Sequence, residues 1–174
     1  IPTDNLFAAP ILLSDIQSKI GTNNAMVVSP DVGGVVRARL IASRINSDLA
    51  IVDKRREKAG ESEVMNIIGD VTDRSCFMID DIVDSAGTLC NAADALISAG
   101  AKEVYAHVTH GVLSGEAIKR VNDSALTKLV ITDTINETDD IKNSDKIEIV
   151  SVVHLLGEAI RRISEERSVS SLFD

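Results

Sequence analysis

Residues 77–89, FMIDDIVDSAGTL, give the strongest indication of the fold. An apolar run leads into three acidic residues, and a turn of small residues follows them. Beyond the turn, apolar residues recur at helical spacing as far as Gly100, a residue type that commonly ends helices. This order predicts a buried strand, a tight loop and a helix from about Thr88 to Ala99.

The same alternation of strand and helix patterns extends in both directions from this stretch. Short apolar runs predict strands at residues 25–29, 49–52, 76–79, 104–108 and 129–132. Helical spacing predicts further helices over residues 33–45 and 151–165. Continuous apolar strands alternating with helices indicate a mostly parallel sheet covered on both faces. We therefore expect an α/β fold, a three-layer doubly wound sheet of about five strands, as one domain over residues 1–174.

The composition excludes several classes of protein. The 174 residues hold 18 Lys and Arg against 27 Asp and Glu, a net charge of −9 that argues against general nucleic-acid binding. No apolar run approaches the roughly 18 residues of a membrane span, so we expect no membrane partner. Two cysteines, Cys76 and Cys90, fit neither a disulfide framework nor a zinc site, and we expect reduced core thiols.

The first residues, Ile1-Pro2-Thr3-Asp4, have no basic or apolar region of a signal peptide. A cytoplasmic protein is therefore expected. The missing Met suggests that the chain begins part-way through something longer.

In a parallel sheet, ligands bind beyond the carboxyl ends of the strands, so polar residues there are the candidates. After the strand at 76–79, small residues allow backbone amides to approach an anion, and Ser85 and Thr88 add hydroxyl donors. Carboxylates at Asp80, Asp81 and Asp84 suit sugar hydroxyls. The pattern describes a site for a phosphorylated sugar; the alternative is plain helix capping beside a solvated turn.

Three consecutive cations, Lys54, Arg55 and Arg56, directly follow another predicted strand. Charge runs are usually solvated surface, and the residues alone leave that alternative open. At a strand end, such cations also suit the anionic oxygens that develop in phosphoryl-type transfer. The Gly-containing segment from residue 57 to 70 is able to move as a lid.

A third candidate loop is SPDVGG, residues 29–34. Its paired glycines permit close approach of a ligand to the backbone, and Asp31 is an oxygen donor of the kind that Mg²⁺ prefers. The alternative is that Asp31 is an N-cap beside an ordinary turn.

Residues 77–89 resemble the phosphoribosyl-pyrophosphate loop of two families, the type I phosphoribosyltransferases and the ribose-phosphate pyrophosphokinases. The resemblance implies that the acidic pair, Asp80 in particular, contacts the ribose hydroxyls. It also implies a loop that wraps the sugar 5-phosphate, made of Asp84, Ser85, Ala86, Gly87 and Thr88.

The cation run, with EVMNIIG downstream, is similar to the flexible catalytic loop of the pyrophosphokinases. The resemblance implies that Lys54 is the catalytic cation and that Arg56 is catalytic and contacts the substrate phosphates. Glu57 departs from the Pro more usual there. SPDVGG resembles the family's magnesium-binding segment, which makes Asp31 the expected Mg²⁺ ligand.

Weaker candidates lie in the second half of the chain. Residues 109–115, THGVLSG, resemble a family segment in which His110 would form a wall of the ribose site. His107 and His154 are expected to be structural. The C-terminal SVSSLF resembles a family tail that helps bind a regulatory nucleotide or phosphate, which implies regulatory contacts at Ser168, Ser170 and Phe173.

The resemblance covers the chain from end to end, but family members are about twice as long. It therefore implies the C-terminal half of a ribose-phosphate diphosphokinase, which makes phosphoribosyl pyrophosphate and AMP from ribose 5-phosphate and ATP. The adenine site would lie mostly in the other half, so this fragment alone is expected to be inactive. A homo-oligomer, a hexamer when full-length, is implied as well. The alternatives are a type I phosphoribosyltransferase and a non-catalytic regulatory subunit.

Overall fold

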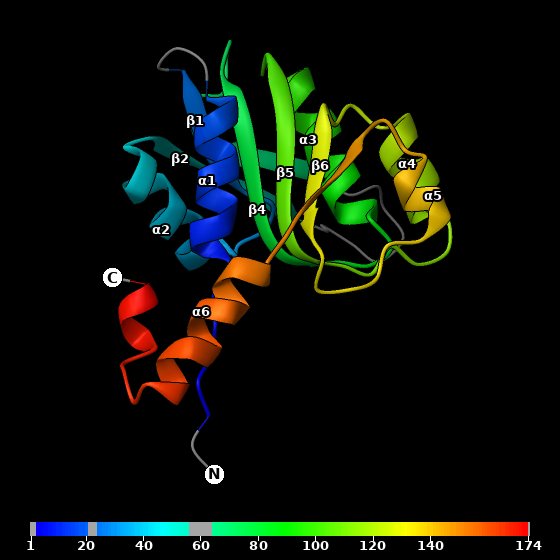
Figure 1. The fold of residues 1–174 in the computed structure, drawn as a ribbon. Helices are drawn as coiled ribbons and strands as arrows, with labels where there is room; N and C mark the ends of the chain where they lie inside the picture. Colours follow the sequence, from blue (N-terminus) through cyan, green and yellow to red (C-terminus); the bar gives the residue numbers. More distant parts are fainter. Residues whose placement is uncertain (1–2, 21–23, 56–63, 174) are drawn as a thin grey trace.

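The computed structural model describes residues 3–20, 24–55 and 64–173. Seven strands form one sheet in the order β3-β2-β1-β4-β5-β6-β7 (Figure 1). All neighbours are parallel except β2 and β3. The strands are β1 (Ala25–Ser29), β2 (Asp48–Arg55), β3 (Val64–Ile68), β4 (Ser75–Val83), β5 (Glu103–Gly111), β6 (Lys128–Thr132) and β7 (Ile147–Val150).

The predicted fold class is confirmed, but the sheet has seven strands rather than about five. The two additional strands, β3 and β7, are the outermost strands, with five and four residues. Edge strands of this length carry weak sequence patterns because only one neighbour pairs with them and part of each side faces solvent. The segment expected to act as a lid therefore includes an antiparallel strand.

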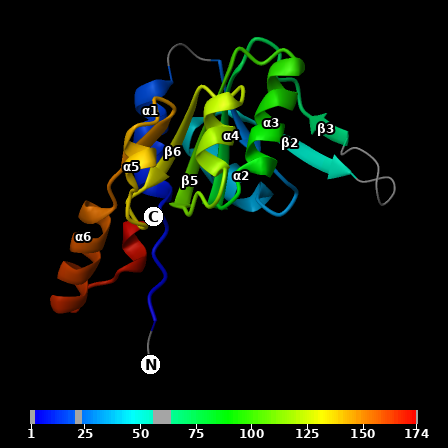
Figure 2. The ribbon, with the colours of Figure 1, turned by 90° about the vertical axis from the view of Figure 1, so that its right-hand side faces the viewer.

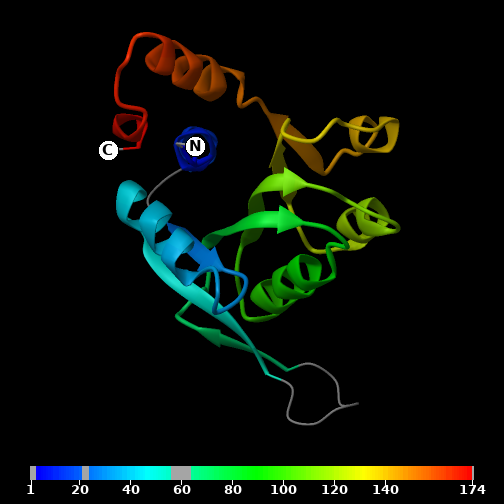
Figure 3. The same cartoon turned by 90° about the horizontal axis from the view of Figure 1, so that it is seen from below.

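Helices cover both faces of the sheet, as Figure 3 shows from below. Their bounds are α1 (Ala9–Lys19), α2 (Val35–Ile45), α3 (Gly87–Ser98), α4 (Ala117–Asp123), α5 (Asp139–Lys142) and α6 (Val153–Ser164), and a short 3-10 turn, η1 (Ser170–Leu172), follows. Helix α2 ends at Ile45, and its C-cap residue Asn46 has a φ of 51°. Gly100, which the sequence predicts as the residue that ends a helix, follows α3 and has a φ of 95°.

Two aliphatic clusters form the core, one on each side of the sheet. Strand β4 contributes to both because successive side chains of a strand alternate between its faces. Phe77 and Ile79 pack with α1 and α2, whereas Cys76 and Met78 pack with α3. Cys76 and Cys90 are free and buried, as expected, and burial raises the pKa of the Cys76 thiol to about 12.

A buried hydrogen bond connects α1 to the sheet. The fully buried His107 on β5 lies 2.7 Å, Nε2 to Oδ2, from Asp15 of α1. Burial lowers the pKa of His107, although Asp15 acts in the opposite direction. His107, expected to be structural, thus contacts helix α1 and does not line the cavity described below.

Helix α6 leaves the body of the molecule together with the C-terminal segment (Figures 1 and 2). Of its twelve residues only Ala159 is buried. His154 is the second residue of this helix. None of the described helices has the length and apolar character to cross a lipid bilayer.

Candidate active site

The loop after β4 forms one wall of a cavity of about 250 Å³ at the carboxyl edge of the sheet. Asp31, from the loop after β1, lies on the same cavity because β1 and β4 are parallel neighbours. The structure thus brings together candidate residues that are about 50 positions apart in the sequence. The candidates that line this cavity are Asp31, Asp80, Asp84, Ser85, Ala86, Gly87 and Thr88.

The loop turns sharply at Ala86, whose φ of 61° and ψ of 0° place it in the left-handed region. Helix α3 begins immediately afterwards, at Gly87, with no side-chain cap. In the described part of the chain, no protein acceptor is found for the amides of Gly87, Thr88 and Leu89. The alternative that Asp84 or Ser85 caps this helix is therefore wrong, and the helix start presents unpaired donors to the cavity, as anion sites do.

The acidic pair has a partner that the sequence analysis missed. Arg37 of α2 donates from Nη1 to Asp80 at 3.0 Å and from Nη2 to Asp81 at 2.6 Å. Burial raises the pKa of Asp80, as does the adjacent Asp81, although the Asp81 amide and Arg37 act in the opposite direction. Arg37 therefore offsets part of the mutual repulsion of these two neighbouring carboxylates.

The two acids of the pair differ in placement. Asp80 has a side chain 26% exposed and lines the cavity, whereas Asp81 is 59% exposed and does not. Because Asp80 ends the buried part of β4 and Asp81 follows it, their side chains leave opposite faces of the strand. The structure therefore places Asp80 on the wall of the cavity and Asp81 outside it.

Asp31 has a structural contact as well as a place on the cavity. Its Oδ1 accepts the Gly34 amide at 2.7 Å, and its backbone carbonyl accepts the Ser29 hydroxyl at 2.6 Å. A Cβ at Gly34 would lie 2.9 Å from the Ser29 Oγ, so a side chain there would displace the Ser29 hydroxyl from this turn. The N-cap of α2 is Gly34, not Asp31. No hydrogen bond to Oδ2 of Asp31 is found among the described residues.

Lys54 lies within β2 and pairs with Met65 of β3, so the first two cations belong to a strand rather than a loop. The hairpin of β2 and β3 extends beyond the neighbouring strands (Figure 2). Arg56, the second expected catalytic cation, lies outside the described residues, and so does Glu57.

His110 does not line the cavity. Its Nδ1 lies 2.9 Å from the Thr134 Oγ1, after β6, on the side of β5 away from the phosphate loop. The next residues do support that loop, since the amides of Val112 and Leu113 donate to the carbonyl of Val83 at 2.9 and 3.2 Å. Residues 109–115 therefore support the site through their backbone, whereas the side chain of His110 contacts Thr134 instead.

The C-terminal tail folds back onto two helices. Arg162 of α6 donates to the carbonyl of Ser168 at 3.0 Å, and Arg44 of α2 donates to the carbonyl of Phe173 at 2.8 Å. The ring of Phe173 packs edge-on against Phe7, with centroids 5.3 Å apart. Ser170 begins η1. The three expected regulatory residues therefore lie close together, but away from the cavity.

Solved structures define the class of fold. The crystal structure of phosphoribosylpyrophosphate synthetase from Mycobacterium smegmatis superimposes with a TM-score of 0.83 and 32% identity, over 91% of this chain and 51% of that one. Purine phosphoribosyltransferase from Pyrococcus horikoshii shares the fold, with a TM-score of 0.50 and 18% identity over 83% and 84% of the two chains. The fold is that of a phosphoribosyltransferase-type α/β domain.

Sequence comparison then identifies the family. Residues 55–174 match the model of the phosphoribosyl synthetase-associated domain, and the chain belongs to this family. Ribose-phosphate pyrophosphokinase from Agrobacterium fabrum is 61% identical over 174 residues, which are 100% of this chain and 56% of that protein. The chain spans about half the length of the curated relatives it matches.

Proposed function

We propose that this chain is the sugar-phosphate half of a ribose-phosphate diphosphokinase. The complete protein would transfer the diphosphoryl group of ATP to the C1 hydroxyl of ribose 5-phosphate, giving phosphoribosyl pyrophosphate and AMP. The observation that carries the proposal is the cavity in which an uncapped helix start and the carboxylate of Asp80 face one space. The 61% identity to a protein named ribose-phosphate pyrophosphokinase supports it.

The geometry suggests how ribose 5-phosphate binds. The amides at the start of α3 and the hydroxyls of Ser85 and Thr88 would donate to the 5-phosphate, and the helix dipole favours its negative charge. The carboxylate of Asp80 would accept hydrogen bonds from ribose hydroxyls. Arg37 holds that carboxylate in place. The sugar is thereby fixed at both ends, which orients its C1 hydroxyl and removes much of the entropic cost of reaction.

The transferring group needs positive charge, which we assign to Lys54 and Arg56. Cations there would stabilise the negative charge that builds on the diphosphoryl oxygens in the transition state. Asp81 and Asp84 stay within the proposed substrate contacts, Asp84 at the cavity and Asp81 beside it.

The donor set of the site fits Mg²⁺ but not a metal held entirely by protein. No group of three or more metal-binding side chains is found among the described residues. Mg²⁺ takes one or two carboxylates and fills its remaining positions with water and substrate phosphates. Asp31, which lines the cavity and has Oδ2 available, would hold it. When bound, the ion would neutralise and orient the phosphate oxygens.

Further parts of the proposal concern the whole protein. We place the adenine site of ATP mainly in the half that this chain does not include, since the relatives are nearly twice as long. A homo-oligomer, a hexamer in the complete enzyme, and a cytoplasmic location complete the proposal. Ser168, Ser170 and Phe173 would contact a regulatory nucleotide or phosphate.

The decisive experiment replaces Lys54 by Ala in the full-length protein. We expect kcat to fall by about two to three orders of magnitude, the cost of removing one transition-state charge. The dissociation constant of ribose 5-phosphate, measured by calorimetry, should change little. Lys119→Ala, on an exposed helix, is the matched control. Near-normal turnover of the Lys54 variant would remove this residue from the mechanism.

A further inference from the structure

The phosphate loop is held from behind through its carbonyl oxygens. Four successive carbonyls, of residues 83 to 86, each accept a hydrogen bond from the protein body. Val83 accepts two bonds and the other three carbonyls accept one each, so four of the five bonds come from backbone amides. These are Val112 and Leu113 to Val83, Ser114 to Asp84 at 3.1 Å, and Cys90 to Ala86 at 2.9 Å. The remaining carbonyl, of Ser85, accepts instead from Nη1 of the Arg120 side chain at 2.7 Å.

The direction of a carbonyl fixes the direction of the next amide. In a trans peptide the C=O of one residue and the N–H of the following residue point in opposite directions, and no cis peptide is present among the described residues. The carbonyls of residues 83 to 85 are held by Arg120 of α4 and by residues 112–114 before that helix, so the following amides, of residues 84 to 86, point away from α4. Since this loop lines the cavity, the bond from Arg120 sets the direction of the Ala86 N–H in particular.

Rotation of the Ser85–Ala86 peptide plane would relieve backbone strain at Ala86. Ala86 is buried with φ 61°, a conformation that costs an L-residue roughly 1–2 kcal/mol. Rotation of this peptide plane by half a turn would carry φ of Ala86 into the negative, relaxed range. The same rotation would withdraw the Ala86 N–H and present the Ser85 carbonyl, which repels anions. Strained backbone persists only where its surroundings hold it.

We infer that Arg120 is a positioning residue for the phosphate loop: it holds the Ser85–Ala86 peptide in the anion-binding orientation without touching the anion. The inference rests on the proposed function. Arg120 belongs to the last turn of α4 and does not line the cavity, so its guanidinium acts through the loop backbone. Helix α4 itself starts at Ala117, shortly after residues 112–114, which hold the neighbouring carbonyls.

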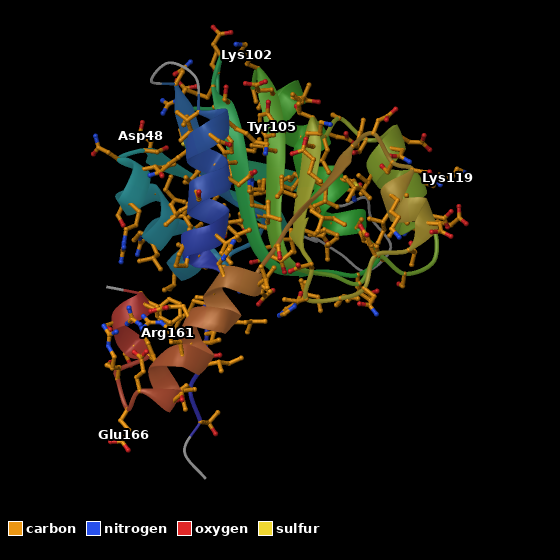
Figure 4. All side chains as sticks on the ribbon, in the orientation of Figure 1. Asp48, Lys102, Tyr105, Lys119, Arg161 and Glu166 are labelled. Carbon is orange, nitrogen blue, oxygen red and sulfur yellow. The ribbon has the colours of Figure 1, made fainter. Side chains whose placement is uncertain are left out.

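The test measures ribose 5-phosphate binding to the full-length protein by calorimetry. We expect Arg120→Met to raise the dissociation constant about tenfold, the loss of one charge-assisted hydrogen bond. Lys119→Met is the matched control, since Lys119 is 72% exposed, makes only a 3.9 Å contact with Glu116 and lies at the outer edge of α4 (Figure 4). It should leave binding unchanged. Arg120→Lys, which keeps one donor, should recover part of the affinity.

A double-mutant cycle separates positioning from direct attraction. In the Ala86→Gly background the left-handed conformation costs almost nothing, so Arg120→Met should raise the dissociation constant only about twofold. In steady-state kinetics, KM for ribose 5-phosphate should rise while KM for ATP stays constant.

The outcomes are distinct. An unmodified protein that does not bind ribose 5-phosphate overturns the proposed function. Binding by that protein together with equal affinity of the Arg120→Met and Lys119→Met variants overturns the inference alone. An equal loss in both backgrounds shows a direct contact between guanidinium and phosphate, which also overturns it. Should Arg120→Met not fold, Arg120→Lys in the two backgrounds provides the same comparison.

Discussion

Two segments leave the same edge of the sheet, and they are built in opposite ways. The loop after β4 is held through four successive backbone carbonyls and leads into a helix with five buried residues. The segment after β7 leads into α6, which has one buried residue and is joined to its tail through arginine side chains. Arg161 and Glu166, labelled in Figure 4, lie on this outlying part. The contrast shows where the backbone is held most closely: successive carbonyls of the first segment are bonded to the protein body, whereas the second segment is held to its neighbours mainly by long arginine side chains.

The largest effect is expected from Ala86→Val. A β-branched residue in the left-handed region, inside a buried turn, should lower the free energy of unfolding by about 3 kcal/mol and abolish sugar-phosphate binding. Chemical denaturation and calorimetry measure both effects. Ala86→Gly, which accepts the same φ, is the control and should keep its affinity. Normal binding by the Val variant would mean that the backbone turn is not needed.

A smaller effect is expected from Asp80→Asn, with opposite signs for affinity and stability. Affinity for ribose 5-phosphate should fall about tenfold because ribose hydroxyls lose a charged acceptor. The free energy of unfolding should not fall. Burial raises the pKa of Asp80, so the folded state binds more protons than the unfolded chain. The contribution of Asp80 to stability therefore decreases as the pH rises above the ordinary pKa of an aspartate.

In Asp80→Asn, the decrease of stability with rising pH that Asp80 causes should be missing from the pH profile of the unfolding free energy. Asp81→Asn, more exposed and outside the cavity, should weaken binding less. A loss of stability in Asp80→Asn as large as its loss of affinity would contradict the assignment of Asp80 to binding.

The smallest effect concerns α6 and is expected on acidification. Hydrogen bonds from Arg161, and then Arg162, lower the pKa of Glu158 to about 2. The contribution of this carboxylate is complete above its ordinary value of 4.5 and is lost as pH falls through about 2. Nuclear magnetic resonance should therefore show the tail loosening over this range. In Glu158→Gln the tail should have no such transition, whereas an identical transition would assign it to another group.

The sequence predicts the site loop well and the contacts that support it poorly. Residues 77–89 carry their strand, turn and helix signals locally, so the order of acids, small residues and hydroxyls is enough to indicate a sugar-phosphate site. Arg37 and Arg120 reach the same loop from 43 and 35 residues away, respectively. Their roles depend on which strands are neighbours, and no local pattern reports that.

The cation run illustrates a different reason for error. The pairing of β2 with β1 ends at Ile51, but β2 continues through Asp53 and Lys54 because the edge strand β3 pairs with it there. The pairing of β2 with the segment after residue 63 is antiparallel within an otherwise parallel sheet, which the alternating strand and helix pattern does not indicate.

The two buried cysteines allow local opening of the structure to be measured in the natural chain. Cys76 lies on the strand before the phosphate loop and Cys90 on the helix after it, and both are protected by packing. Burial also raises the pKa of both thiols. In neutral solution a thiol reagent therefore finds neither an accessible sulfur atom nor a reactive thiolate. Alkylation of each position would therefore proceed at the rate at which that element opens. Without any added label, the alkylation rates of Cys76 and Cys90 would therefore report the opening of the strand before the anion-binding turn and of the helix after it.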